Sequence, residues 1–401
     1  MSFITNIRSV AKYESKILVR SWFFRIFTLL AVVFLGFFNF AMMLMEDNFG
    51  LWFAKSVSSN IPYLNLLLLN TGQAVVAVFL SSEFLKRDKK LDTSEVFYVR
   101  PLSNAEYVVG KIWGNLRVFL FLNLLVLAIV LAFNFMASGV TVDLPVYLVY
   151  FFLISIPTLI FIIGLSIFLM LLLKNQALTF ILLLGYIGLT LFYIQDKFYY
   201  LFDYMVYNLP LFKSTIVGFS NLELILNHRA IYFFAGLGFI FFTIFLFKRL
   251  PNARRSHYPW LFLSFCMFLL MGTAGFRHVR SILREGEMRA LYTSINNKYV
   301  YEPKMAIDYY DISVEQKSET IRSVVGMEGT ALAASEVFIF CLNPGLRVEE
   351  VKDGEKSLNF KREEQILAVD FGRKIEKGDT ISFSVSYEGR IKDDFCYLDI
   401  P

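Results

Sequence analysis

The chain has 401 residues, of which 56% are hydrophobic and 18% are charged, whereas charged residues make up roughly 25% of an ordinary soluble domain. This balance excludes a wholly soluble protein. The formal net charge of +5 does not require a nucleic-acid partner, because Lys and Arg that face anionic lipid explain it. The apolar excess ends near Phe276, so the sequence predicts a membrane protein with a soluble C-terminal domain.

The first twenty residues predict a helix that lies in the membrane interface. Four cations recur every four residues and form one basic stripe: Arg8, Lys12, Lys16 and Arg20. Apolar residues cover much of the remaining surface: Ile4, Ile7, Val10, Ala11, Ile17 and Leu18. Such a helix places its apolar face at the acyl boundary and its cations at the headgroups. The chain then turns at "RSWFFR" into the first membrane span.

Seven segments are apolar and long enough to cross a bilayer as helices, since a span needs about 20 apolar residues. They are Phe23–Met45, Pro62–Ser82, Val118–Met136, Pro145–Leu173, Ala177–Ile194, Ala230–Phe247 and Pro259–Phe276. The first segment is too long for a signal-peptide core and lacks a clear cleavage site, so it is predicted to remain as a span.

Lys and Arg near the span ends predict the orientation, because they accumulate on the cytoplasmic side. With the N-terminus inside, the outer loops are poor in cations: Lys55 in the first, and Lys197, Lys213 and Arg229 in the third. We therefore expect a multi-pass protein of a bacterial inner membrane, with the N-terminus cytoplasmic and the C-terminal domain outside. An arginine cluster after the last span leaves open a different span count and a cytoplasmic domain.

A charged block, "FLKRDKKLDTSEVFYVRPLSNAEYVVGK", interrupts the apolar chain at positions 84–111. Within it, Ser103 and Glu106 match the S/T-x-x-E capping box. The pattern predicts a helix that begins at Asn104 and continues into the third span, preceded by a second structured piece. Two interpretations are open: a solvated loop that only anchors the topology, and a docking surface for a cytoplasmic partner.

The block and the element order over residues 1–250 resemble the type-2 ABC exporter permeases. The residues that match the family pattern are Arg87, Asp88, Thr93, Glu95, Pro101, Ser103, Tyr107, Gly110 and Lys111. The resemblance implies a six-span permease core, followed here by a seventh span, and a coupling helix that seats in a cleft of an ATP-hydrolysing subunit. The coupling residues that it implies are Arg87, Asp88, Thr93, Glu95, Arg100, Pro101, Ser103 and Glu106.

The chain lacks the phosphate-binding loop that ATP hydrolysis needs. Gly110–Lys111 is the one Gly-Lys dipeptide, and Ile112 follows it in place of Ser or Thr. The chain is therefore predicted not to be an enzyme, with ATP and Mg²⁺ bound by a separate cytoplasmic ABC ATPase subunit. The resemblance also implies two permease halves, as a homodimer or a paired heterodimer, while the transported substrate stays open among peptide, lipid and drug.

The most polar residues inside the spans are Asn65, Asn70 and Gln73 in the second and Asn123 in the third. They either hydrogen-bond across helices or line a substrate path between two permease halves. The spans hold no Asp, Glu or His that an ion-coupled carrier would use. The aromatic stretch 195–229 fits an outer re-entrant or surface-lying helical pair, or simply interfacial aromatics.

From about Met305 the apolar pattern has a period of two, which predicts strands. The expected strands lie in "IDYYDISVEQ", "ASEVFIFCLNPGLRVEEVKDGEKSLNF", "QILAVDF" and "DTISFSVSYEGRI", with Asn-Pro-Gly and Asp-Gly turns between them. They predict a β-sandwich or a saddle-shaped sheet. Cys341 and Cys396 form a disulfide if this domain is outside, or remain two buried thiols.

The stretches "FIFCLNPGLRVEEV", "LNF", "GDTISFSVSYEGRI" and "YLDIP" resemble the N-terminal β-domain of the aminopeptidase N-like zinc peptidases. The resemblance covers about residues 306–401 and implies an incomplete domain of that type, with a peptidase catalytic fragment as a further partner. The histidines His228, His257 and His278 form no H-E-x-x-H motif, so neither a metal site nor peptidase activity is predicted.

The sequence thus predicts a polytopic α-helical membrane protein with a C-terminal all-β sandwich or saddle domain. Its parts are an interfacial helix (1–21), a permease domain (22–250), a seventh span (251–276), a helical or irregular linker (277–304) and a β-domain (305–401). The alternative to an exporter permease is a membrane anchor or scaffold subunit of a peptidase complex without transport activity.

Overall fold

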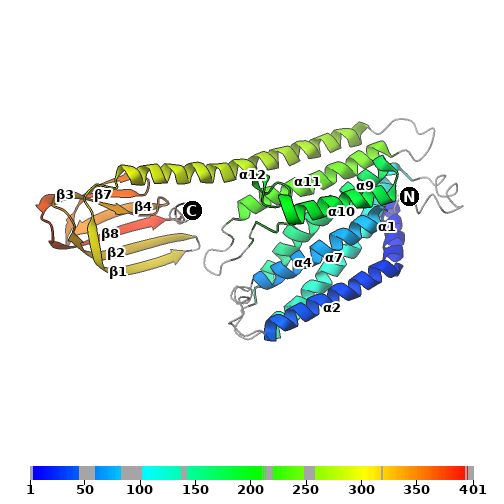
Figure 1. Ribbon diagram of the computed structural model, residues 1–401, viewed down its shortest axis with the longest axis horizontal. Helices are drawn as coiled ribbons and strands as arrows, with labels where there is room; N and C mark the ends of the chain where they lie inside the picture. The colour runs from blue at the N-terminus through cyan, green and yellow to red at the C-terminus, as the bar shows by residue number, and fades with distance from the viewer. Residues whose placement is uncertain are drawn as a thin grey trace. The chain divides into compact units, whose positions relative to one another are not determined.

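A computed structural model of the chain describes residues 3–44, 59–82, 102–136, 142–209, 211, 213, 219, 221–247, 258–317, 319–392 and 395. The chain forms two compact units (Figure 1). The first, helical unit contains the described residues up to Val279. The second, mainly β unit begins at Arg280.

Within the described residues, seven stretches of helix are long and apolar enough to cross a membrane. They are α2 (Trp22–Leu44), α4 (Asn60–Ser82), α7 (Asn104–Met136), the run of α8 (Leu144–Tyr150), η2 (Phe151–Ser155) and α9 (Ile156–Leu173), α10 (Gln176–Leu189) with η3 (Thr190–Ile194), α11 (Leu222–Leu246) and α12 (Tyr258–Lys298). A further helix, α1 (Phe3–Arg20), precedes them. The predicted class, a polytopic helical membrane protein with a C-terminal β-region, is confirmed.

The break between the first two helices and the start of α7 agree with the predictions from the sequence. The helix break at Ser21 separates α1 from α2, where the chain was expected to turn into the first span. Helix α7 begins at Asn104, as its capping box predicts. Helix α12 is longer than the seventh span, because residues 277–298 of the expected linker continue it without interruption.

The aromatic stretch before α11 differs from the prediction. Residues 195–209 contain only the short 3₁₀ helix η4 (Phe198–Tyr200) and turns, so the helical pair, one of the two alternatives, is not present in this part. Helix α11 begins at Leu222, well before the predicted Ala230. Arg229, expected in an outer loop, therefore lies inside a helix, and its side chain is buried.

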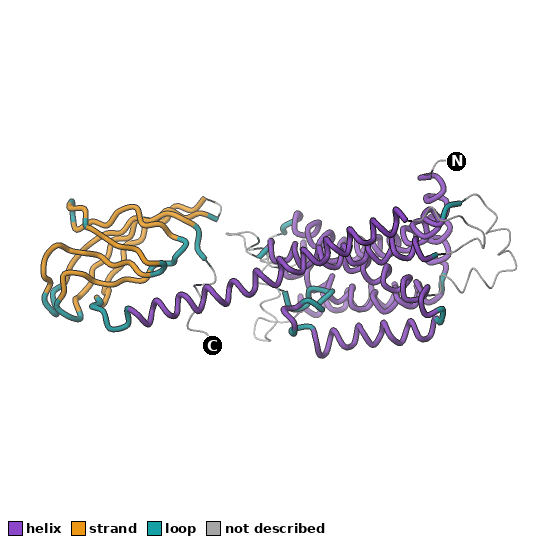
Figure 2. Tube along the Cα trace, turned by 90° about the horizontal axis from the view of Figure 1, so that it is seen from above, coloured by secondary structure: helices purple, strands orange, loops and turns teal. Residues whose placement is uncertain are grey.

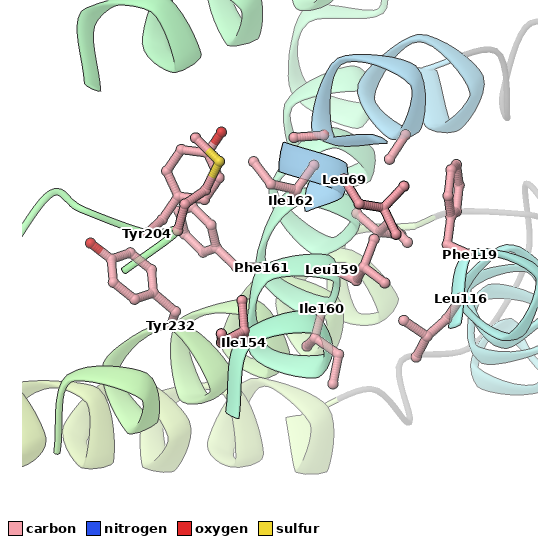
Figure 3. Packing of buried hydrophobic residues seen from close by; sticks show 14 of the residues in the cluster. Leu69, Leu116, Phe119, Ile154, Leu159, Ile160, Phe161, Ile162, Tyr204 and Tyr232 are labelled. Carbon is pink, nitrogen blue, oxygen red and sulfur yellow. The ribbon is translucent and has the colours of Figure 1, made fainter. Parts of the chain in front are cut away.

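The helical core depends on close contact between α9 and α11. A Cβ atom on Gly236 would lie 2.7 Å from the backbone of Ile160, and one on Gly164 would lie 2.6 Å from the carbonyl oxygen of Gly236. Small residues allow such approach in membranes, where packing rather than water expulsion drives helix association. Beside this contact, Phe161 of α9 meets Tyr232 of α11 edge to face, with ring centroids 5.0 Å apart (Figure 3).

The second unit contains two antiparallel sheets, which Figure 2 shows in orange. The five-stranded sheet has the order β1-β2-β8-β4-β5, and the three-stranded sheet has the order β3-β7-β6. The strands are β1 (Met305–Lys317), β2 (Thr320–Ala331), β3 (Ser335–Cys341), β4 (Leu346–Asp353), β5 (Lys356–Ser357), β6 (Asn359–Glu363), β7 (Ile366–Ile375) and β8 (Thr380–Gly389). Strand β2 was not predicted, since Gly326 and Gly329 interrupt its apolar alternation.

A single aromatic and aliphatic core joins the two sheets. Phe338 of β3 and Phe383 of β8 both contact Phe371 of β7, with ring centroids 5.9 and 5.5 Å apart. The last turns of α12 attach to this core through Gln365, whose amide donates to the Tyr292 carbonyl at 2.6 Å. The second half of α12 is therefore part of the β unit.

We predict that Gly236→Ala lowers the stability of the helical unit, because the added Cβ meets backbone atoms that cannot move aside. Overpacking of this kind typically costs about 1–3 kcal/mol. An SDS titration of the detergent-solubilised protein, followed by circular dichroism, would measure the change. Gly185→Ala in α10 is the matched control, since its Cβ would meet nothing within 4 Å, and it should match or exceed the parent. Equal stability of both variants would contradict the packing argument.

Candidate functional site

The structure describes only the last part of the charged block. Six of the implied coupling residues lie outside the described residues: Arg87, Asp88, Thr93, Glu95, Arg100 and Pro101. Of the other two, the Ser103 backbone N–H donates to Glu106 Oε2 at 2.6 Å, and the Glu106 N–H donates to Ser103 Oγ at 3.1 Å. The predicted capping box is confirmed, and it fixes the point at which the chain enters α7.

Helix α1 is joined to this entry point by buried polar contacts. Lys111 Nζ of α7 lies 3.0 Å from Glu14 Oε1 of α1, and the two side chains are only 1% and 4% exposed. One turn nearer the cap, Asn6 Nδ2 donates to Glu106 Oε1 at 2.8 Å. The Glu106 carboxylate thus completes the cap of α7 with one oxygen and holds α1 with the other.

Two glycines bring the helices close enough for these contacts. A Cβ on Gly110 would lie 2.7 Å from Val10 Cβ, and one on Gly114 would lie 2.8 Å from the Ala11 carbonyl oxygen. The Ser15 hydroxyl can then donate to the Gly114 carbonyl at 2.6 Å. This corrects one expectation, because Val10, Ala11 and Leu18 are buried inside the protein rather than in the acyl boundary.

Three of the four polar residues proposed for a substrate path come together in one ring of hydrogen bonds. Gln73 donates to Asn70 at 2.6 Å, and Asn123 donates to Gln73 at 2.9 Å. Ser155 closes the ring, since it accepts from Asn70 at 3.3 Å and donates to Asn123 at 2.7 Å. All four side chains are fully buried. The ring joins α4, α7 and η2, so the cross-helix hydrogen bonds of the first interpretation are present.

The fourth residue, Asn65, lies apart from this ring. It pairs with Asn39 of α2 through two amide hydrogen bonds of 2.7 and 3.0 Å. Both side chains are buried. The substrate-path interpretation of Asn65, Asn70, Gln73 and Asn123 stays a hypothesis.

The π-helix η2, which supplies Ser155, is held by a buried arginine. Pro157 has no N–H, so the carbonyl of Leu153, four residues earlier, lacks its usual helical partner. Arg229 Nε donates to that oxygen at 2.7 Å. Its Nη2 atom donates to the Ile154 carbonyl at 3.3 Å, and its Nη1 atom donates to the Tyr204 carbonyl at 2.7 Å. One guanidinium therefore satisfies carbonyl groups from the irregular helix and from the loop before α11.

The same loop contains a buried carboxylate and a left-handed segment of three consecutive residues, Phe198–Tyr200. Asp203 is 1% exposed and accepts from the backbone N–H groups of Tyr207 and Asn208 at 2.9 and 2.8 Å. Burial raises the pKa of Asp203, and these hydrogen bonds oppose the rise. The rings of His228 and His278 contact the Tyr200 and Tyr199 carbonyls at 3.0 and 2.9 Å, which holds the left-handed segment to α11 and α12.

No group of three or more His, Cys, Asp or Glu in the described part of the chain has a metal-binding arrangement. Cys341 is an exposed residue rather than a buried one, although partial burial of its thiol raises the pKa. Cys396, its proposed disulfide partner, lies outside the described residues. The disulfide therefore stays a prediction.

No known protein family model matches the chain, and no curated protein matches it. Among solved structures it is similar to a two-domain M1 zinc metallopeptidase mutant bound to L-tryptophan, with 17% identity and a TM-score of 0.21. An M1 zinc metallopeptidase from Deinococcus radiodurans has 17% identity and a TM-score of 0.20. Each match covers 22% of this chain, which spans about a fifth (21%) of the length of either structure. The resemblance to peptidases is thus weak and confined to one part of the chain.

We predict that Lys111→Met destabilises the helical unit by about 3–5 kcal/mol, because it removes the ammonium group that lies 3.0 Å from the buried Glu14 carboxylate. The double variant Glu14→Gln, Lys111→Met should recover most of this loss, since neither charge of the pair remains. The same SDS titration would measure both. If the single and the double variant were equally unstable, the ion pair would not be the reason for the loss.

We also predict that Arg229→Lys destabilises the unit by at least about 2 kcal/mol. A single ammonium group cannot reach the Leu153, Ile154 and Tyr204 carbonyls together, and each buried group left without a partner costs about 1–3 kcal/mol. Arg277→Lys is the matched control, because Arg277 is 66% exposed and pairs with an exposed Glu223. Similar stability of the two variants would contradict the proposed role of Arg229.

Proposed function

We propose that this chain is the permease subunit of an ATP-driven exporter, which works with a separate cytoplasmic ABC ATPase subunit and moves an unidentified peptide, lipid or drug across the cytoplasmic membrane. The proposal rests on the sequence pattern at positions 84–111, which resembles the coupling segment of the type-2 ABC exporter permeases. The chain carries no phosphate-binding loop of its own, so the ATP and Mg²⁺ belong to the partner.

One structural observation supports this function more than any other. The described end of the charged block is built as a fixed junction, in which the capping box, the Glu14–Lys111 pair and the Asn6–Glu106 hydrogen bond join α1 to the start of α7. A loop that only anchors topology needs no such junction. A coupling segment does need one, because a force applied to it must reach the spans without being lost in a flexible joint.

The proposed mechanism follows from this arrangement. ATP binding by the partner closes its two subunits, and residues 85–101 pass that motion to the second and third spans. The capped start of α7 and the attached α1 then move as one body. The ring of Asn70, Gln73, Asn123 and Ser155 ties α4, α7 and η2 together further along the same helices, so the displacement extends into the membrane.

We predict that a stoichiometric ATPase co-purifies with the tagged chain from gently solubilised native membranes. The triple variant Arg87→Ala, Glu95→Ala, Arg100→Ala should reduce the recovered ATPase to the background of untagged membranes, because it removes three charges of the proposed docking surface. Mass spectrometry of the purified complex gives the stoichiometry.

The matched control is Lys374→Ala, Glu376→Ala, Lys377→Ala, which removes two cations and one anion from the β unit. This control should retain the ATPase. Recovery of a peptidase fragment and no ATPase by the parent chain would overturn the exporter proposal in favour of a membrane-anchored scaffold. Loss of the ATPase from both triple variants would remove the evidence for docking at the charged block.

A further inference from the structure

The β unit contains an open pocket of about 630 Å³, a volume within the usual range for ligand sites. Its largest wall is the inner face of the five-stranded sheet, which contributes Tyr310, Ile312, Val325, Met327, Val385 and Tyr387. The end of β3, the start of β7 and the C-terminal end of α12 form the other walls. The lining is mainly apolar, so the pocket suits apolar groups.

One wall of the pocket is also the edge of a sheet. Strand β1 ends the five-stranded sheet, and no other strand of the described part pairs with its second edge. It extends over 13 residues, and its inner face presents Tyr310, Ile312 and Val314, which are 54%, 57% and 54% exposed. A long edge with exposed apolar side chains and no inward charge is a template for pairing with another strand.

The strand register separates the two faces of β1. Tyr310 lies opposite Met327, and Ile312 lies opposite Val325, so these residues face the pocket. Since side chains alternate along a strand, Asp311 and Glu315 face the other way.

That outer face is acidic along residues 309–315 of β1, with the cation Lys317 at the far end of the strand. Glu328 of β2 lies opposite Tyr309 and adds a third carboxylate. Arg322 lies opposite Glu315. Its guanidinium nitrogens also lie 3.3 and 4.0 Å from the carboxylate oxygens of Glu349 and Glu388, so these residues share its positive charge. A strand added to β1 would therefore meet apolar groups on its inner face and negative charge on its outer face.

We propose that the edge of β1 with which no described strand pairs, together with the adjoining pocket, binds an extended peptide segment in which apolar residues alternate with Lys or Arg. The peptide adds a strand to the sheet through main-chain hydrogen bonds to β1, the recognition mode of β-strand addition. Every second side chain enters the pocket beside Tyr310 and Ile312. The intervening cations face Asp311 and Glu315.

A bound acyl chain would use fewer features of this site than a bound peptide. It fills an apolar pocket, but it offers no hydrogen bonds to the N–H and C=O groups along the edge of β1 and no positive charge for the outer face. The peptide site goes beyond the proposed export function and does not depend on it, because it lies wholly within the β unit.

The test uses the full-length protein in detergent and a fluorescently labelled heptapeptide, Lys-Val-Lys-Phe-Lys-Val-Lys, with binding followed by fluorescence anisotropy. Ile312→Asp should weaken binding at least about tenfold, since it places a charge in the pocket. Asp311→Lys should weaken it through repulsion of the basic residues. Both positions are exposed, so the variants should fold. Ser384→Ala, on the outer face of β8 and away from the edge, is the control and should bind like the parent.

Backbone methylation of the peptide separates strand addition from nonspecific attraction. The amides of an added strand point alternately toward β1 and toward solvent. Two peptides, N-methylated on the odd and on the even residues, should therefore differ, with one losing binding at least about tenfold and the other binding like the parent peptide.

Three outcomes would overturn the proposal. The first is equal binding of both methylated peptides and of a scrambled peptide, which indicates charge attraction alone. The second is no peptide binding together with Ile312-dependent binding of a fluorescent fatty acid, which assigns the pocket to lipid. The third is no peptide binding together with a dimer that Ile312→Asp dissociates, which assigns the edge to a second copy of this chain.

Discussion

The helical unit depends on one constraint: a polar group buried where water cannot reach it must find its partner inside the protein. At such positions, seven side chains have a partner on another element: Asn39, Asn70, Gln73, Asn123, Glu14, Lys111 and Arg229. Because a missing partner would leave a group unsatisfied, these contacts fix the relative positions of the helices more sharply than the surrounding leucines and phenylalanines can.

The chemical type of these buried partners differs from one part of the helical unit to the next. At the α1–α7 junction they are charged, with Glu14 against Lys111. Among α4, α7 and η2 they are neutral, in the ring completed by Ser155. Near the loop before α11, a guanidinium meets carbonyl groups that Pro157 and the π-helix leave free. The hydrogen-bonded ring and the arginine site thus both stabilise the irregular η2. Arg229 also donates to the Thr158 hydroxyl, next to Pro157, although 71 residues separate Thr158 from Arg229.

The β unit meets a different requirement. Its core buries Phe338, Phe371 and Phe383 between two sheets, but the three-stranded sheet is too narrow to cover the β1 side of the larger one. The inner face of β1 therefore stays exposed beside a pocket, while its outer face carries carboxylates. An exposed sheet edge promotes aggregation unless another segment covers it, so a peptide bound along the edge and in the pocket would also protect it.

The sequence by itself determined what local pattern can encode. Runs of apolar residues gave the spans, the change from an unbroken run to a period of two marked the β unit near Met305, and Ser103 with Glu106 fixed the start of α7. It could not reveal β2, whose glycines hide the alternation, or the start of α11. Nor could it pair Glu14 with Lys111, Asn70 with Ser155, or Arg229 with Leu153, and it left Arg229 in a loop. Only the tertiary structure decided these pairings. The sequence around a lone polar residue in an apolar helix does not indicate a partner 76 to 97 residues away, and folding alone brings the two together.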